Sequence, residues 1–264
     1  NWSLVNTGLL NTNLYTLNTS QGNLFAGTQG GGVYKSTDNG INWFYSNNGL
    51  TSSYVWSFTT SGNNLIAGCF DAGGCFISTN NGNNWNSSNT WLLNQNVTSL
   101  EVLNSTIYAG TNRDGVFKST NNGLSWENSN NGLPNRKVYS LCSSGTNIFA
   151  GIGGGGGIFK STDNGNNWSV SNIGLTNQTV LSLEKVGSNL FAGTYGGGLF
   201  KSTNDGLNWI TSNVGITNNN IWDITSTGST IISSTENGVF RSTNEGANWV
   251  ASNTGLTNTY VRSL

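Results

Sequence analysis

The eight residues Ser36-Thr37-Asp38-Asn39-Gly40-Ile41-Asn42-Trp43 decide the fold, because close copies of them return along the whole chain. The copies read STNNGNNW ending at Trp85, STNNGLSW at Trp126, STDNGNNW at Trp168, STNDGLNW at Trp209 and STNEGANW at Trp249. With Trp2 included, the motif tryptophans are spaced 40 to 42 residues apart. Such a period indicates an array in which each copy is one supersecondary unit.

Four short runs with the alternating pattern of β-strands lie within each period. In the first copy they cover residues 14–17, 23–28, 32–36 and 42–45, separated by turn residues. No run has helical periodicity or helix caps. Four antiparallel strands per period, repeated six times, are typical of the blades of an all-β β-propeller. A linear solenoid of the same units is the alternative that the pattern leaves open.

The motif Ser-x-Asp-x-Gly-x-x-Trp resembles the Asp-box (BNR) repeat of sialidase-type and related β-propellers, and the resemblance covers all six copies. Among such repeats, the motif is most similar to the regular Asn/Gly/Thr-rich propeller repeats of bacterial secreted and surface proteins. The resemblance implies one propeller domain over residues 1–264, with the motif turns on the face opposite the functional one. The repeats cover about 2–42, 43–84, 85–125, 126–167, 168–208 and 209–248, with a partial one at 249–264.

The motif residues have a structural interpretation. The glycine supplies a left-handed turn residue, the Asp or Asn two positions earlier can bond nearby backbone N–H groups, and the Trp buries its ring. One carboxylate or none at this position of each turn argues against a calcium site. These structural residues are Asp38, Gly40, Trp43, Asn80, Gly82, Trp85, Asn121, Gly123, Trp126, Asp163, Gly165, Trp168, Asn204, Gly206, Trp209, Asn244, Gly246 and Trp249.

Composition excludes several functions. The chain has no His, so imidazole catalysis and His-ligated zinc are ruled out, and we expect neither a metal nor a cofactor. Ten Lys and Arg against eleven Asp and Glu give a net charge of −1, which provides no basic field for nucleic acid. No apolar run approaches the ~18 residues of a membrane helix.

Departures from the repeat mark candidate ligand-binding residues. The second position of the first strand is often aromatic, and the loops between second and third strands, and between consecutive blades, carry further aromatic and charged residues. Aromatic and polar groups on one face suit a sugar, and packing between blades is the competing interpretation. The candidates are Tyr54, Trp56, Asp71, Trp91, Arg113, Asp114, Arg136, Tyr195, Trp222, Asp223 and Glu236.

These observations favour a non-catalytic extracellular or cell-surface module with a structural or adhesive role. Glycans, other surface proteins and further copies of the chain are the expected partners. The alternative is a glycoside hydrolase, either sialidase-like or using a carboxylate pair such as Asp71 with Asp114 or Asp223 with Glu236. Sialidases of the Asp-box family use an arginine triad. This chain has four Arg in all and lacks the family's Arg-Ile-Pro signature, which argues against a sialidase.

Cys69 and Cys75 replace the usual repeat residues at either side of the second blade's hairpin loop. Their places on neighbouring strands predict a disulfide, in keeping with an oxidising compartment. Cys142 is expected to be a lone buried thiol.

Residues 2–17 align with residues 249–264 without a gap. We therefore expect parts of a seventh blade, with residues 1–5 as its fourth strand and 260–264 as its first. Three explanations stay open: a piece of a longer chain, a six-bladed ring with extra strands, or open edges that neighbouring subunits complete.

Overall fold

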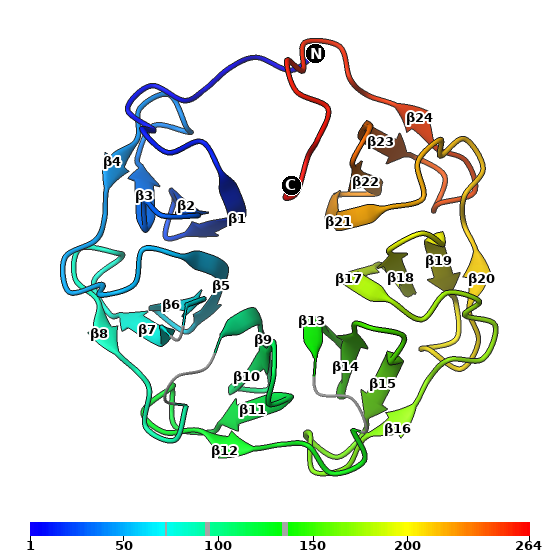
Figure 1. Cartoon of the computed structure of the whole chain (residues 1–264), viewed down its shortest axis with the longest axis horizontal. Coiled ribbons are helices and arrows are strands. Elements are labelled where there is room, and N and C mark those ends of the chain that lie inside the picture. Colours follow the sequence, from blue (N-terminus) through cyan, green and yellow to red (C-terminus); the bar gives the residue numbers. More distant parts are fainter. Residues whose placement is uncertain (72, 93–95, 134–136) are drawn as a thin grey trace. The chain divides into compact units, whose positions relative to one another are not determined.

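The computed structural model describes residues 1–71, 73–92, 96–133 and 137–264. In these residues, 24 strands form six antiparallel sheets of four strands each (Figure 1). Within every sheet the strands stand in chain order, so each sheet is one propeller blade. The predicted all-β propeller with four-stranded blades is confirmed, and it has six blades. No helix in the described part of the chain is long and apolar enough to cross a membrane.

The chain divides into two compact units, here called the N-terminal unit (residues 4–130) and the C-terminal unit (residues 1–3 and 131–264). The N-terminal unit contains β1 (Leu14–Ser20), β2 (Asn23–Thr28), β3 (Val33–Ser36), β4 (Phe44–Tyr45), β5 (Val55–Ser61), β6 (Asn64–Cys69), β7 (Gly74–Ser78), β8 (Asn86–Ser87), β9 (Val97–Leu103), β10 (Thr106–Thr111), β11 (Val116–Ser119) and β12 (Glu127–Asn128). The C-terminal unit contains β13 (Val138–Ser144), β14 (Asn147–Ile152), β15 (Gly157–Ser161), β16 (Ser169–Val170), β17 (Val180–Val186), β18 (Asn189–Thr194), β19 (Gly198–Ser202), β20 (Ile210–Thr211), β21 (Ile221–Thr227), β22 (Thr230–Thr235), β23 (Gly238–Ser242) and β24 (Val250–Ala251).

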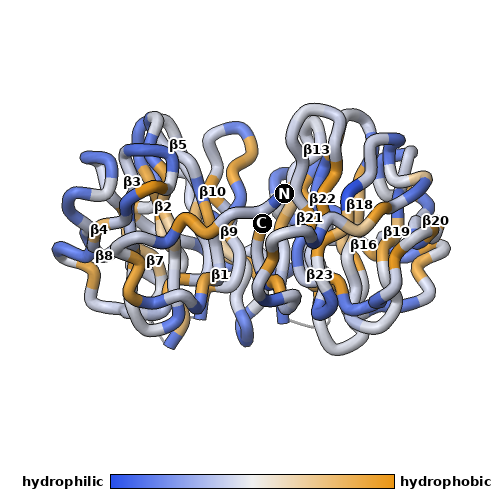
Figure 2. Tube along the Cα trace, turned by 90° about the horizontal axis from the view of Figure 1, so that it is seen from above, coloured by the Kyte–Doolittle hydropathy of each residue, from blue (hydrophilic) through white to orange (hydrophobic). Residues whose placement is uncertain are grey.

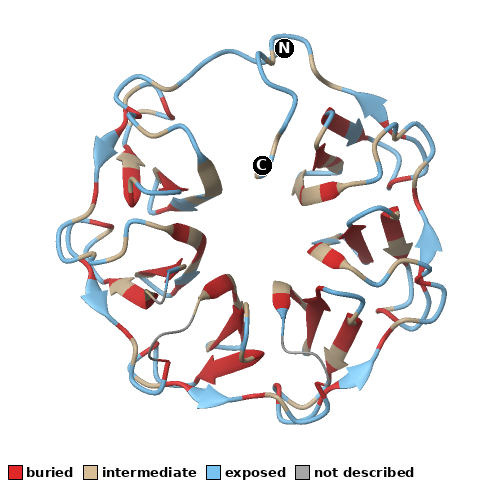
Figure 3. Cartoon of the chain, in the orientation of Figure 1, coloured by how far each residue is buried: buried red, intermediate tan, exposed pale blue. Residues whose placement is uncertain are grey.

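Burial changes systematically across each blade. The second and third strands are the most deeply buried, as in β18, whose six residues are all buried. The fourth strands are only two residues long and exposed, as Figure 3 shows. Figure 2 shows that hydrophobic stretches follow the strands and that many connecting loops are hydrophilic. The core therefore lies in the middle strands and between neighbouring blades.

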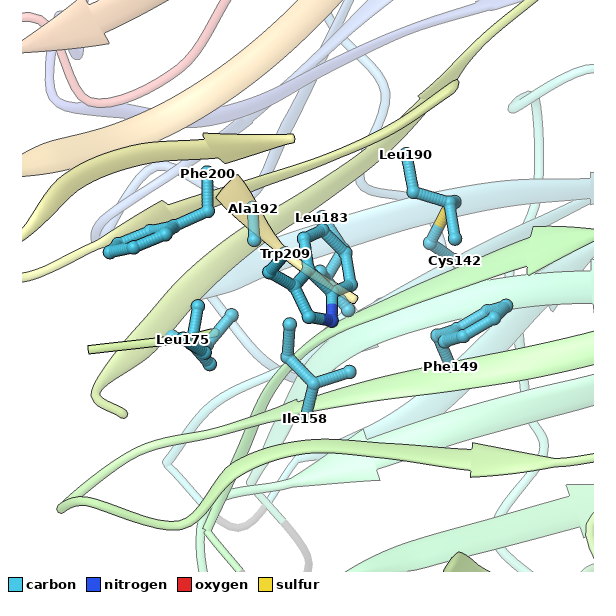
Figure 4. Packing of buried hydrophobic residues seen from close by; sticks show 10 residues of the cluster. Cys142, Phe149, Ile158, Leu175, Leu183, Leu190, Ala192, Phe200 and Trp209 are labelled. Atoms are coloured by element: carbon cyan, nitrogen blue, oxygen red, sulfur yellow. The ribbon is translucent and has the colours of Figure 1, made fainter. Parts of the chain in front are cut away.

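Neighbouring blades pack through shared hydrophobic clusters. In the C-terminal unit, Trp209 is 2% exposed and packs among residues of the fourth and fifth blades (Figure 4). Truncating a buried Trp to Ala typically destabilises a protein by roughly 3–5 kcal/mol. The rest of this cluster consists of Cys142, Phe149, Ile158, Leu175, Val180, Leu183, Leu190, Ala192 and Phe200.

The repeated motif forms a tight turn after each third strand, called here the box turn (in the fifth blade, residues 202–209). Two successive residues, Asp205 and Gly206, have left-handed φ values of 55° and 80°. Ser202 Oγ accepts a hydrogen bond from the Gly206 N–H at 2.9 Å. Asn204 Oδ1 accepts one from the Asn208 N–H at 2.9 Å. Asp38 makes the equivalent bond to the Asn42 N–H at the same distance, so Asn and Asp serve this turn alike.

The box turn also joins one blade to the preceding blade. Trp209 Nε1 donates to the Ser171 carbonyl at 2.8 Å, and Ser171 Oγ donates to the Gly206 carbonyl at 2.6 Å. A Cβ added to Gly206 would lie 2.6 Å from the Phe149 ring of the preceding blade. The motif is therefore conserved from copy to copy for turn geometry and for packing between blades.

The expectation of a partial seventh blade is wrong. Residues 1–5 and 260–264 form no strand. Trp2 donates its backbone N–H to the Thr254 carbonyl at 2.8 Å, and the Val261 N–H bonds the Thr235 carbonyl at 3.2 Å. A blade needs second and third strands between its first and fourth, and the described residues supply none for these segments, so they make isolated hydrogen bonds instead of a ladder.

Candidate functional site

Each of the six first strands has a β-bulge at its second residue. A bulge leaves one residue without a ladder partner and turns its side chain out of the regular alternation. The backbone therefore projects a variable position of the repeat from the sheet. The bulged residues are Tyr15, Trp56, Thr98, Tyr139, Leu181 and Trp222.

In the C-terminal unit, the bulged Trp222 is the centre of a group of side chains called here the Trp222 cluster: Tyr195, Trp222, Tyr260 and Arg262. The ring centroids of Tyr195 and Trp222 are 6.1 Å apart in an edge-on arrangement, and those of Trp222 and Tyr260 are 5.9 Å apart. Arg262 Cζ lies 4.9 Å from the Trp222 centroid, a cation–π contact. Tyr195 and Tyr260 stay 49% and 42% exposed, so the cluster reaches the surface.

Polar groups flank the cluster. Asn220 pairs with Tyr195 in an isolated β-bridge and donates its Nδ2 to Glu236 Oε2 at 2.8 Å. Arg262 Nη2 donates to the Tyr260 hydroxyl at 3.1 Å. The flank thus presents an amide, a carboxylate, a guanidinium and a phenol next to aromatic rings.

Asp223 follows Trp222 and replaces the Ser or Thr of the other repeats. Its carboxylate accepts hydrogen bonds from the N–H groups of Ile224 and Leu264, both at 2.9 Å, and from Ser182 Oγ at 3.4 Å. Burial raises the pKa of Asp223 to about 6, although these hydrogen bonds oppose the shift. Asp223 therefore links the backbone at Ile224 and Leu264 next to the cluster, and its pKa lies well above that of an ordinary carboxyl.

The N-terminal unit holds a second aromatic group, the Trp56 stack. The Trp56 ring lies between Tyr15 and Phe70, with centroid distances of 4.7 and 4.1 Å and nearly parallel planes. The Tyr54 carbonyl accepts a hydrogen bond from the Phe70 N–H at 2.9 Å, and the Tyr15 hydroxyl donates to Gln29 Oε1 at 3.2 Å. Because both faces of Trp56 are covered by other rings, this stack has the geometry of packing between blades.

Several predicted residues are not brought together. Asp71 and Arg113 are exposed in different loops, and Asp71 and Asp114 belong to different blades, in the loops that follow β6 and β10. The backbone of Asp114 serves its turn, because its carbonyl accepts a hydrogen bond from Asn130 Nδ2 at 2.7 Å. Arg136 lies outside the described residues.

Trp91 is not where the sequence predicted. It was expected beside the other loop residues, on the face opposite the box turns. Instead it lines a groove with Thr120 and Ser125 of a box turn and with residues of β11 and β12. The direction in which the chain leaves the fourth strand decides this placement, and the strand pattern does not report that direction.

The predicted disulfide is also wrong, because Cys69 and Cys75 are both free and buried. Cys69 pairs with Gly74 and Gly68 pairs with Cys75, so the two thiols are one residue out of register. Successive side chains of a strand point to opposite faces, which places the thiols on opposite sides of the sheet. They belong to different hydrophobic clusters, and burial raises the pKa of Cys69 to about 12.

Sequence reasoning left four contributors out of the candidate set. Tyr260 and Arg262 complete the Trp222 cluster, and Tyr15 and Phe70 complete the Trp56 stack. A signal was present: Arg262 and Tyr15 occupy the second first-strand position of their repeats, the same position as Trp222. Only the bulge shows that this position projects.

Solved structures similar to this chain are β-propellers of varied function. The extracellular domain of the putative one component system BT4673 from B. thetaiotaomicron superposes with a TM-score of 0.80 at 15% identity, over 97% of this chain and 36% of that one. The GH74 enzyme of Niastella koreensis gives 0.71 at 16%, over 96% and 40%. YCF48 from Cyanidioschyzon merolae gives 0.68 at 15%, over 94% and 88%. At these identities the likeness shows the fold alone.

The chain spans about a third of the length of the BT4673 domain structure. No curated protein sequence matches it. A family model does: the DUF6242 beta propeller domain matches residues 50–181, which is half of the chain and runs from the end of the first blade into the fifth. With six four-stranded blades built on one repeat, the chain belongs to the family of DUF6242 β-propeller domains.

Proposed function

We propose that this chain is a non-catalytic extracellular or cell-surface module that binds carbohydrate at the Trp222 cluster. The observation that carries the proposal is the arrangement of Tyr195, Trp222 and Tyr260 around Arg262, with two of the rings more than 40% exposed. Sugars have apolar C–H faces and a rim of hydroxyl groups, so they suit an aromatic surface with polar groups at its edge.

The polar flank matches such a ligand. Glu236 and Asn220 hold each other at 2.8 Å, which leaves a fixed acceptor and amide beside Tyr195. Arg262 is fixed by its contacts with Trp222 and Tyr260, so its N–H groups are oriented before a ligand arrives. Pre-orientation reduces the conformational entropy that binding would otherwise remove.

A non-catalytic role agrees with the state of the nearby carboxylates. Asp223 is bonded by two backbone N–H groups and by Ser182, and Glu236 is bonded by Asn220. Each carboxylate thus has a structural partner, whereas a glycosidase needs two that act on one glycosidic bond. One observation favours the hydrolase alternative: the pKa of Asp223, about 6, would suit a general acid.

The proposed location draws on the likeness to the extracellular sensor domain and on the resemblance of the repeat to Asp-box propellers of secreted and surface proteins. We also assign the six box turns to the Asp-box class, because Asp38 and Asp163 make the same hydrogen bonds as the Asn residues of the other turns.

A glycan array followed by titration calorimetry tests the proposal. The wild-type chain should bind at least one glycan, and Trp222→Ala and Arg262→Gln should each weaken binding at least tenfold. Phe44→Ala is the matched control, because it removes an exposed aromatic ring (64% exposed) from β4, outside the cluster. Circular dichroism checks that every variant is folded.

Two results would refute the proposal. Either no glycan binds, or the bound glycan is indifferent to both cluster variants. Release of reducing sugar from the bound glycan, abolished by Asp223→Asn, would instead establish the hydrolase.

A further inference from the structure

Trp91 occupies a backbone position that the other repeats reserve for glycine. Six residues after every other motif tryptophan stands Gly8, Gly49, Gly132, Gly174, Gly215 or Gly255. All six glycines have positive φ, and a Cβ added to any of them would lie 2.0–2.3 Å from the carbonyl oxygen of a motif tryptophan.

The backbone around Trp91 keeps the glycine conformation, with a φ of 68°. The carbonyl of the preceding residue, Thr90, accepts a hydrogen bond from the Trp126 N–H at 3.1 Å. The corresponding bonds of the other copies are 2.8 or 2.9 Å, as between Trp209 and Ile173. A bulky residue with positive φ is strained, so the third blade accommodates Trp91 at a loss of stability.

Burial does not compensate for this strain, because Trp91 is 78% exposed. Strained residues that bring no packing gain occur mostly at functional sites. The ring stands beside a groove of about 510 Å³, within the range of small-molecule sites. The groove lies wholly in the N-terminal unit and is lined by Trp91, Phe117, Lys118, Thr120, Ser125, Trp126, Glu127 and Asn128.

The chemistry of the groove selects a neutral, hydroxyl-rich ligand. Lys118 Nζ lies 3.4 Å from Glu127 Oε1, so the two charges in the groove compensate each other and favour no net charge in a ligand. Around them stand the hydroxyls of Thr120 and Ser125 and the amide of Asn128, while the indole offers an apolar platform.

We propose that Trp91 and this groove form a carbohydrate-binding site on the third blade, in which the indole stacks on a pyranose ring. The site is separate from the Trp222 cluster and does not depend on carbohydrate binding there. Its ligand is an uncharged oligosaccharide, because an ionic one would have to break the Lys118–Glu127 pair.

Trp91→Gly is an unusually informative variant, because it restores the residue of the other repeats. It removes the stacking platform and also the strain. We expect its melting temperature to rise by roughly 2–4 °C and its affinity for oligosaccharide to fall at least tenfold. Trp91→Tyr retains a ring and should stay within about threefold of the wild-type affinity.

The probes are cellohexaose, mannohexaose and chitohexaose at millimolar concentration. N-bromosuccinimide oxidation with peptide mass spectrometry reads Trp91 separately from the other tryptophans, and at least one probe should slow its oxidation fivefold or more. Calorimetry with that probe then compares the wild type, Trp91→Gly, Trp91→Tyr and Trp222→Ala.

The proposal is overturned if none of the three saccharides protects Trp91 or if Trp91→Gly binds them like the wild type. It is also overturned if Trp91→Gly has a lower melting temperature than the wild type, because the ring would then be a structural residue. Loss of binding in Trp222→Ala with full binding in Trp91→Gly would sink this site and leave the proposed function standing. The opposite pattern would establish this site and show that the probe does not bind at the Trp222 cluster.

Discussion

Asp223 should make the stability of the protein depend on pH between about 4 and 7. Its carboxyl is ordinarily half-protonated at pH 3.8, and burial raises the folded-state pKa to about 6. In the neighbouring blade the same position is Ser182, whose Oγ accepts a hydrogen bond from the Ile224 N–H at 3.1 Å. Asp223→Ser therefore supplies an equivalent acceptor for the Leu264 N–H and removes the ionisable group.

The folded state binds the proton of Asp223 more tightly than the unfolded state does. Well below pH 3.8 both states are protonated, and the group does not penalise folding. As the pH rises through 4 to 6 the unfolded chain ionises first, so the free energy of unfolding falls, and above pH 6 the loss is complete. A shift of about two pKa units corresponds to about 3 kcal/mol.

Urea denaturation followed by tryptophan fluorescence at pH 4, 5, 6, 7 and 8 measures this effect. The difference between Asp223→Ser and the wild type should grow by about 2–3 kcal/mol from pH 4 to pH 8, in favour of the variant, because contributions of other groups cancel. Asp71→Ser, which removes an exposed loop carboxylate, is measured alongside as the control. A flat profile for Asp223→Ser, within about 0.5 kcal/mol, would refute the reasoning.

Three further predictions concern the scaffold. Ser161→Ala should lower the free energy of unfolding by about 1–3 kcal/mol, because it removes the side-chain acceptor of a buried N–H in its box turn. Asp163→Asn should leave the free energy of unfolding, measured by chemical denaturation, unchanged. Equal effects of the two substitutions would contradict this division of roles. Trp209→Phe should destabilise the protein by roughly 1–3 kcal/mol, measured by calorimetry, because it loses a hydrogen bond and part of the buried ring. An unchanged melting temperature would show that this contact between blades contributes little to stability. Cys69 and Cys75 should resist iodoacetamide in the native protein and react in denaturant, as mass spectrometry of the digest will show; a peptide linking the two would disprove the register.

The scaffold was predictable because its information is local. The motif from Ser36 to Trp43 contains its own turn residues, its own hydrogen-bond acceptor and the ring whose Nε1 donates to the Val5 carbonyl. The strands predicted at 14–17 and 23–28 appear as β1 and β2, and the fourth strand shortens to two residues. Repetition added strength, since six copies of one pattern average out local ambiguity.

The errors arose where one residue of register or direction decides the outcome. A hairpin between Cys69 and Cys75 was predictable, yet a shift of one position moves a side chain to the other face of the sheet. Trp91 shows the same limit of prediction, because the strand pattern predicted a loop there but not the direction in which the loop runs.

By itself, the sequence determined the all-β propeller with four-stranded blades and the box turns, since alternation, turn residues and a period of about 41 residues act over short distances. Only the tertiary structure decided which variable residues meet: Trp222 with Arg262, Trp56 between Tyr15 and Phe70, and Trp91 over its groove. The physical reason is that these contacts join residues from different strands and loops, and they depend on bulges and loop directions that local sequence does not encode.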